Sequence, residues 1–402
     1  MKHIPVTALN VSLAEMPIGK LALHDRRVWF QYDTAFLSKR LELSPFKLPL
    51  RPEVIPCEDR VFDGLFGLFN DSLPDGWGRL LLDRHMRSLG IAPENLTTLD
   101  RLACVGQHGM GALIYKPDHS IDKISSKALD VDRLAAKSRA VLDGTSKTVI
   151  DELLSLNGSS AGARPKIMVG VSKDKKHIIH GVDNIPDGYD HWIIKFTSST
   201  DPNDNGAIEY AYSLMARAAG IDMPETHLFP AAKGPGYFGV KRFDRNSNNR
   251  IHVHTVSGLL HTDHRQPLLD YESILKTTMV LTKSMPEVEA FFRLAVFNVF
   301  SRNRDDHAKN FSFLMNPNGI WHTAPAYDLT FSSGPGGEHS TTTMGEGKNP
   351  GQSHLQMLGK KLGIKKTDDI INQVQEAISQ WKKFANIANV IKGSRDLIAK
   401  NI

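Results

Sequence analysis

The residue types best suited to chemistry lie together in a polar segment around position 305. Asp305 and Asn310 form the pattern D-x-x-x-x-N within residues 301–310. In phosphoryl-transfer enzymes such a pair shares one irregular loop, where the aspartate accepts the proton of the attacking hydroxyl and the asparagine holds Mg²⁺. The pattern alone also fits an ordinary polar loop after a helix. His307 could indicate a zinc cluster, but no set of His or Cys partners at zinc-site spacing accompanies it.

A second aspartate, Asp328, follows Asn310 by 18 residues and favours the catalytic interpretation. Residues 311–322 predict a β-hairpin that turns at the sequence NPNG, residues 316–319. Such a hairpin would carry Asp328 back beside the first loop, as in protein kinases. Carboxylate and amide oxygens suit Mg²⁺, which keeps waters and bridges phosphates. The alternative for Asp328 is a helix cap after a proline turn.

Two earlier segments predict the phosphate-binding side of such a site. Residues 157–166 (NGSSAGARPK) are rich in small residues, which let backbone N–H groups approach phosphates. The segment is neither a Walker A loop nor G-x-G-x-x-G, and a plain flexible turn is the alternative. Lys195 lies in an apolar strand, and Glu209 opens the next helix and could pair with it, because a buried lysine needs a partner. Glu209 could instead only complement the helix N-terminus.

The elements that must position these residues can be read from hydrophobic spacing and turn residues. Extended segments are expected at residues 28–32, 177–180, 191–196 and 236–240, and helices from near positions 75, 207 and 286. Residues 117–148 predict a polar connector that contains one helix. Thr367 is expected to cap a long C-terminal helix with apolar positions up to Ala388, and residues 333–351 to form a mobile Gly- and Ser/Thr-rich loop.

Composition restricts the class of protein. The chain has 402 residues, 41% hydrophobic, with 49 basic and 44 acidic side chains and a net charge of +5. This mild excess has no long basic block, so direct nucleic-acid binding is permitted rather than indicated. The two cysteines form no disulfide framework, the first residues lack the long apolar region expected of a signal peptide, and no stretch approaches the roughly 18–20 apolar residues expected of a membrane span. We therefore expect a cytoplasmic protein without membrane contact.

Four motifs resemble the HipA serine/threonine kinases of type II toxin–antitoxin modules. They are SSAGARPK (159–166), KRFDR (241–245), RDDHAKNFS (304–312) and PAYDL (325–329). The sequence LPDGWGR (73–79) is similar to the N-terminal domain of that family. The resemblance covers nearly the whole chain and implies an α+β fold. It also implies that the chain has three parts: an N-terminal β-rich domain (1–115), a connector with a mixed kinase N-lobe (116–250), and a mainly helical C-lobe (251–402).

The resemblance also implies residue roles. Asp305 would be the catalytic base, Asn310 and Asp328 would bind Mg²⁺, and Ser159 would be autophosphorylated. ATP would be held by Ala161, Gly162, Ala163, Arg164, Pro165, Lys166, Lys195, Lys241, Arg242, Phe243, His307, Ala308, Lys309, Asn310, Tyr327 and Asp328. A phosphate on Ser159 adds negative charge beside the ATP phosphates and should switch the enzyme off. Lys241 stands where the best-known members carry an acidic residue; because the resemblance implies that backbone groups of residues 241–243 hold the adenine, this difference concerns side-chain details and not ATP use.

The family implies partners as well. A small helix-turn-helix antitoxin of the HipB kind would bind the chain and link it indirectly to DNA, and the protein substrate would be a translation component such as an aminoacyl-tRNA synthetase. Two alternatives remain open from the residues. One is a small-molecule phosphotransferase with the same catalytic loop. The other is a weakly catalytic co-repressor that binds an antitoxin–DNA complex.

Overall fold

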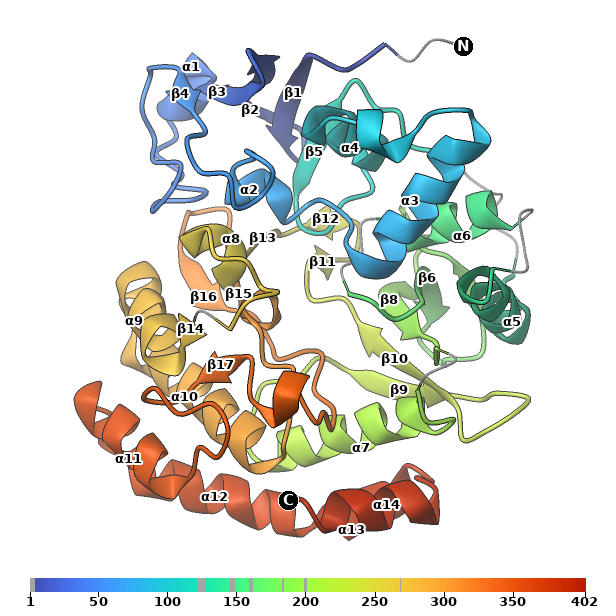
Figure 1. Ribbon diagram of the computed structural model, residues 1–402, viewed down its shortest axis with the longest axis vertical. Coiled ribbons are helices and arrows are strands. Elements are labelled where there is room, and N and C mark those ends of the chain that lie inside the picture. Colours follow the sequence, from blue (N-terminus) through green and yellow to red (C-terminus); the bar gives the residue numbers. More distant parts are fainter. Residues whose placement is uncertain are drawn as a thin grey trace.

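Two five-stranded sheets and a helical region follow one another through the molecule (Figure 1). The computed structural model describes residues 4–121, 128–144, 149–158, 162–182, 184–198, 201–267 and 269–402. The first sheet belongs to the blue and cyan N-terminal part and the second to the green middle part, and the yellow to red C-terminal part is mainly helical. The α+β class expected from the sequence is confirmed.

The first sheet is antiparallel, with strand order β4-β3-β2-β1-β5. Its strands are β1 (Ala8–Leu13), β2 (Met16–His24), β3 (Arg27–Tyr32), β4 (Ile55–Pro56) and β5 (Leu113–Lys116). The expected strand at 28–32 is confirmed by β3, whose alternate residues are buried. Helices α1 (Thr34–Leu37), α2 (Gly67–Asn70) and α4 (Thr98–Val105) accompany the sheet. Phe30 from the sheet packs against Phe69 from α2, with ring centroids 5.0 Å apart.

The second sheet has the order β7-β6-β8-β10-β9. Its strands are β6 (Lys166–Ser172), β7 (Ile178–His180), β8 (Tyr189–Lys195), β9 (Thr226–Phe229) and β10 (Tyr237–Lys241). Helix α7 (Asn205–Ala218) packs against β9 and β10. Helices α3 (Gly76–Ser88), α5 (Val131–Leu142) and α6 (Ile150–Asn157) bury their apolar residues in one cluster with β6 and β8. Helix α3 therefore joins the N-terminal part to the second sheet.

The C-terminal region is mainly helical. Its helices are α8 (Val256–Leu260), α9 (Tyr271–Thr282), α10 (Met285–Phe300), α11 (Gln352–Lys361), α12 (Thr367–Ser379), α13 (Trp381–Ile387) and α14 (Lys392–Ala399). The expected hairpin is present as β15 (Ser312–Met315) and β16 (Trp321–Thr323), and β13 (His252–Thr255) pairs with β15. Short pieces complete the fold: β11 (Arg245–Asn246), β12 (Asn249–Arg250), β14 (Leu269–Asp270), β17 (Thr341–Thr342), η1 (Pro93–Asn95), η2 (Ala308–Asn310) and η3 (Pro335–Gly337).

Two expectations about the C-terminal region are corrected. The long helix is two helices, because the chain leaves α12 at Gln380 before α13 begins. Thr367 does not cap α12: it is the first helical residue, and its hydroxyl donates to the carbonyl of Ile364. The segment 333–351 is not a free loop, because His339, Thr341 and Thr343 are buried and Thr341 pairs with Leu269 of β14.

A closed cluster of charges, the Asp244 cluster, consists of Arg242, Asp244 and Arg245. Asp244 accepts from Arg242 at 2.8 Å and from Arg245 at 2.7 Å, and the N–H of Gly111 donates to it at 2.8 Å. Arg245 also donates to the carbonyls of Gly109 and Gly111. Because Gly109 and Gly111 belong to the turn before β5, the cluster fixes the first sheet to the second.

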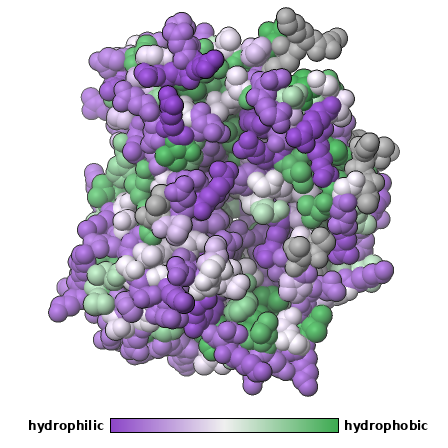
Figure 2. Space-filling model, viewed as in Figure 1, coloured by the Kyte–Doolittle hydropathy of each residue, from purple (hydrophilic) through white to green (hydrophobic). Residues whose placement is uncertain are grey.

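The surface is mostly polar. The face in Figure 2 is mainly hydrophilic, with hydrophobic residues in small separate groups. Within the ranges described above, none of the helices combines the length and apolar character needed to cross a bilayer.

Candidate active site

The catalytic loop follows α10 and carries two adjacent aspartates in opposite environments. The side chain of Asp305 is 58% exposed, whereas Asp306 is fully buried. The amide of Asn310 donates to the backbone carbonyl of Asp305 at 2.7 Å, which closes the turn. Nε2 of His307 lies 4.0 Å from Oδ1 of Asp305. The D-x-x-x-x-N pattern therefore forms one compact loop that presents the Asp305 carboxyl to solvent.

Electrostatics favour proton acceptance by Asp305. The surrounding protein displaces part of the water near its carboxyl and thereby raises its pKa. His307 opposes this shift, and the negative charge of Asp328 adds to it. A raised pKa makes the carboxylate a stronger base than a free aspartate.

Asp306 anchors the loop from below. Its carboxylate accepts from the hydroxyl of Tyr271 at 2.7 Å and from the backbone N–H of Thr341 at 3.2 Å, and it pairs with Nδ1 of His339 at 2.8 Å. Tyr271 in turn accepts from Asn298 on α10. The segment 333–351 thus holds the catalytic loop in position. This contact explains why the centre of the segment is buried.

Lys195 brings the second aspartate into the site, in an arrangement we call the Lys195 cluster. Its Nζ lies 2.5 Å from Oδ1 of Asp328 and also contacts Oε1 of Glu209. Burial alone would lower the pKa of Lys195, but the two carboxylates raise it above its usual value. Burial would raise the pKa of Asp328, but Lys195 and Lys166 lower it. The expected pair of Lys195 and Glu209 is present, with Asp328 on the same ammonium group.

Lys166 supplies a second buried cation. It begins β6 directly opposite Lys195 on β8, and it is 5% exposed. Burial lowers its pKa to about 8, against the opposing effect of Asp328. A Cβ built on Gly162 would come within 2.4 Å of Nζ of Lys166. Lys166 thus lies directly beneath the glycine-rich loop.

The described part of the glycine-rich loop is held at its C-terminal side. Gly162 has a φ of +102°, which favours glycine. Nε of Arg164 lies 3.1 Å from Oδ2 of Asp201, and the N–H of Phe196 donates to the carbonyl of Pro165 at 2.8 Å. Ala163 is exposed. Ser159 and Ala161 lie outside the described residues.

Lys241 is the last residue of β10, and Arg242 and Phe243 follow it; the three residues have unequal roles. The backbone N–H of Lys241 donates to Glu225 and that of Arg242 to His191, so both donors are already used. The Arg242 side chain points into the Asp244 cluster. Among the described residues, the N–H of Phe243 donates to no carbonyl. Phe243 is therefore the residue of this segment best able to donate to a nucleotide base.

Tyr327 and Lys309 connect the catalytic loop to its surroundings. The hydroxyl of Tyr327 donates to the carbonyl of Lys309 at 2.5 Å and contacts Ser312, and its ring packs on Phe243 with centroids 5.5 Å apart. Ala308 is buried within η2. Nζ of Lys309 pairs with Asp75 of the N-terminal part at 2.8 Å. The side chain of Lys309 is thus engaged with protein.

Asp75 is a site residue that the sequence did not reveal. It stands at the N-cap of α3 but makes no side-chain cap hydrogen bond there. Its carboxylate instead accepts from Lys309 and from the backbone N–H of Gly162. Burial would raise its pKa, but Lys309 and Gly162 lower it. An aspartate before a helix normally indicates a cap, so only the tertiary structure identifies this function.

The oxygen atoms of the site fit Mg²⁺ that arrives with a nucleotide. Asn310 donates through its nitrogen to Asp305, which leaves its amide oxygen for a cation. Asp328 supplies a carboxylate whose Oδ1 faces Lys195. In the described residues, no three His, Cys, Asp or Glu side chains form a metal cage. Mg²⁺ typically uses one or two carboxylates and completes its octahedron with phosphates and water, so this sparse set is suitable.

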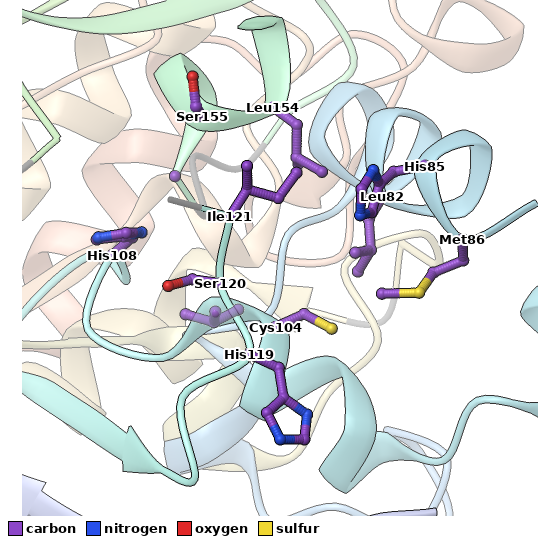
Figure 3. Close-up of a pocket in the computed structure, with 12 residues that line it drawn as sticks. Leu82, His85, Met86, Cys104, His108, His119, Ser120, Ile121, Leu154 and Ser155 are labelled. Atoms are coloured by element: carbon purple, nitrogen blue, oxygen red, sulfur yellow. The ribbon is translucent and has the colours of Figure 1, made fainter. Parts of the chain in front are cut away.

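A pocket elsewhere is distinct from this site. It lies between α3, α4 and α6, and its lining includes Cys104, His108 and Leu154 (Figure 3). Gly158, at the start of the glycine-rich segment 157–166, is part of its lining, but none of the residues individually assigned to ATP or Mg²⁺ lines it. The catalytic candidates instead gather around Lys195 and the loop at 305–310.

Two family models match the chain. Residues 9–116 match the model described as HipA N-terminal domain, and residues 158–381 match the HipA-like C-terminal domain. The second match covers the glycine-rich loop, the Lys195 cluster and the catalytic loop.

One solved structure shows the same fold. HipA of Shewanella oneidensis MR-1, solved with HipB and operator DNA, has a TM-score of 0.71 at 17% identity, covering 98% of this chain and 94% of that chain. The proinflammatory kinase CtkA of Helicobacter pylori is similar over 52% of this chain and 90% of its own, at 14% identity and a TM-score of 0.34. The expected α+β fold is confirmed, and it is the fold of HipA.

Proposed function

The chain belongs to the HipA family, and from this premise we propose that it is an ATP- and Mg²⁺-dependent serine/threonine protein kinase that acts as the toxin of a toxin–antitoxin pair. One observation carries the catalytic part of the proposal. Lys195 lies between Glu209 and Asp328, and Asp328 belongs to the same site as Asp305 and Asn310. A phosphate-binding cation, a metal-binding carboxylate and a base thus meet in one place, as phosphoryl transfer requires.

In the proposed reaction Asp305 accepts the proton of a serine or threonine hydroxyl on the protein substrate. The hydroxyl oxygen forms a bond to the γ-phosphorus as the bond to the β-phosphate oxygen breaks, and ADP leaves. Lys195 and Lys166 bind and orient the phosphates, and Phe243 donates its N–H to the base. Mg²⁺, when bound, would neutralise phosphate charge, with Asn310 and Asp328 holding it.

Regulation and partners form the second part of the proposal. We expect autophosphorylation at Ser159, where a phosphate would repel the ATP phosphates and switch the enzyme off. The Shewanella HipA structure contains HipB and operator DNA. By analogy, a HipB-like helix-turn-helix antitoxin would bind this chain and link it indirectly to DNA. An aminoacyl-tRNA synthetase is the class of protein substrate to test first.

The proposal is tested by autophosphorylation with γ-labelled ATP and Mg²⁺. Asp305→Ala should lower incorporation about 10²- to 10⁴-fold, the usual range for loss of a general base. Asp25→Ala is the matched control, because Asp25 is an exposed aspartate in the turn after β2. Mass spectrometry should locate the label on Ser159. Equal labelling of wild type and Asp305→Ala would contradict the proposal. Transfer only to small metabolites would instead indicate a small-molecule phosphotransferase.

A further inference from the structure

Helix α3 of the N-terminal part contacts both sides of the glycine-rich loop. On the C-terminal side of the loop, Asp75 accepts from the N–H of Gly162, and the N–H of Trp77 donates to the carbonyl of Gly162 at 3.1 Å. On the N-terminal side, α6 leads into the loop and ends at Asn157. His85 of α3 lies 2.7 Å from Asp151 of α6. One helix thus fixes the segments on either side of the loop.

The apolar side of α3 reinforces this arrangement. Leu81 is buried in the same cluster as Leu153 and Leu156 of α6. Trp77 is 1% exposed and belongs to that cluster too. Because a buried aromatic ring resists displacement, the backbone of Trp77 gives Gly162 a fixed partner.

Asp75 also joins two loops that come from different parts of the chain. Its Oδ2 pairs with Nζ of Lys309 in the catalytic loop at 2.8 Å, while Oδ1 contacts the N–H of Gly162. The side chains of Asp75 and Lys309 are 15% and 9% exposed. Little water competes at this bridge, so its charged hydrogen bonds are stronger than those at a surface.

Gly76 keeps the approach close. Its φ is +40°, and a Cβ built on it would lie 2.6 Å from Cα of Ala163 and 2.7 Å from the carbonyl oxygen of Gly162. Backbone meets backbone at this point without room for a side chain. The three consecutive residues therefore act together on Gly162: Asp75 supplies a carboxylate, Gly76 allows the close backbone contact, and Trp77 supplies an N–H donor.

We propose that Asp75, Gly76 and Trp77 form a positioning clamp by which the N-terminal domain sets the place of Gly162 relative to the catalytic loop, and with it the affinity for the phosphates of ATP. This inference rests on the proposed function, since it assigns the N-terminal domain a role in nucleotide binding by the same site. Asp75 is a positioning residue, because it acts through Gly162 and Lys309. Through this clamp the N-terminal domain would contribute to nucleotide binding by the kinase site.

The test uses the full chain and Asp75→Asn, which keeps the shape of the side chain and removes its charge. Asp83→Asn is the matched control, because Asp83 lies on the same helix and pairs with Arg101 at 2.7 Å. We expect Asp75→Asn to weaken the binding of a non-hydrolysable ATP analogue about 10- to 100-fold, as expected for lost hydrogen bonds to a charged group. KM for ATP should rise accordingly, while kcat at saturating ATP changes less. The control should bind like wild type.

Hydrogen exchange at the Gly162 amide gives a second readout, whose wild-type measurement is informative without the variant. In wild type without nucleotide this amide should exchange slowly, and in Asp75→Asn at least tenfold faster. Rapid exchange in folded wild type would overturn the clamp even if Asp75→Asn failed to fold. Unchanged analogue affinity in a folded Asp75→Asn would overturn it as well. If wild type binds no nucleotide, the proposed function itself fails, and a faster Gly162 amide in the variant would then mark Asp75 as structural only.

Discussion

The Lys195 cluster and the Asp244 cluster both bury charge, and they differ in how completely it is satisfied. Both oxygens of Asp244 are occupied by arginine and backbone donors, and the side chain is 0% exposed. In the Lys195 cluster one ammonium serves two carboxylates. Oε2 of Glu209 is buried and has no hydrogen-bond partner among the described residues, and the Asp328 side chain is 35% exposed.

The difference distinguishes a charge that can only be structural from one that is able to bind a ligand. A buried charge with every lone pair filled cannot take a further ligand, and removing one partner leaves an uncompensated ion. A cluster with one cation for two carboxylates and an opening to solvent can accept a metal ion and phosphates. Burial or a shifted pKa alone does not distinguish these cases, because both clusters show them.

The largest effect is expected from Asp328→Asn. The change should lower phosphoryl transfer roughly a thousandfold or more, because metal-held stabilisation of the transition state is worth several kcal/mol. The fold should persist, since Lys195 keeps Glu209. Steady-state kinetics and thermal unfolding of the same preparation check both points. A variant that unfolds while its folded fraction remains active would place Asp328 with the structural charges.

Asp244→Asn should have the opposite profile. Removing this carboxylate leaves Arg242 and Arg245 buried together, at a cost of about 3–5 kcal/mol in the free energy of unfolding. Urea denaturation measures this loss, and Asp174→Asn on the surface is the control. The two arginines hold the pKa of Asp244 below its usual value despite burial. Its contribution is therefore present above the unfolded pKa, about 4, and is lost as the pH falls towards the folded value.

The sequence predicted the Lys195 cluster better than the Asp244 cluster for a physical reason. A lysine in an apolar strand needs a carboxylate, and Glu209 at the start of the next helix was within reach. Asp328 could be connected to them through the hairpin, whose turn residues are explicit. Arg242, in contrast, was expected to contact the nucleotide through its backbone, and no sequence signal assigned a role to its guanidinium, which donates to Asp244 and contacts the sulfur of Met168. Nothing in the local sequence indicates that the turn before β5 would lie against it.

Long-range contacts were also beyond the sequence at α3. The helix and its start at residues 75–77 follow from turn and capping residues, and both are confirmed. The direction of the Asp75 carboxylate depends on Lys309, 234 residues later in the chain. Similarly, the Gly- and Ser/Thr-rich composition of 333–351 indicated mobility, whereas Asp306 holds Thr341 and His339 in place. Side-chain partners across domains require the folded structure.

Glu209→Gln should sharpen the comparison between the Lys195 and Asp244 clusters. It replaces an acid by its amide, as Asp244→Asn does, but we expect a different outcome. Loss of a charged partner for Lys195 should lower kcat/KM for ATP roughly tenfold. Stability should stay the same or rise slightly, since the buried Oε2 of Glu209 lacks a partner among the described residues. Denaturation beside Asp244→Asn measures the contrast. A loss of several kcal/mol in both variants would remove the distinction between the clusters.

The smallest expected effect on activity concerns Lys166. This cation lies opposite Lys195 in the sheet, and its pKa is lowered. Burial brings this pKa to about 8, so the free enzyme loses the positive charge as the pH rises through about 8. We therefore expect kcat/KM for ATP to fall a few-fold between about pH 7 and pH 9, since this quantity reports the free enzyme. Lys166→Arg keeps its charge and should remove the fall. The linked stability has the opposite sign: the unfolded chain holds the proton up to about pH 10.4, so stability rises with pH between the folded and unfolded pKa values. If the variant kept the same alkaline decline as wild type, a group other than Lys166 would govern it.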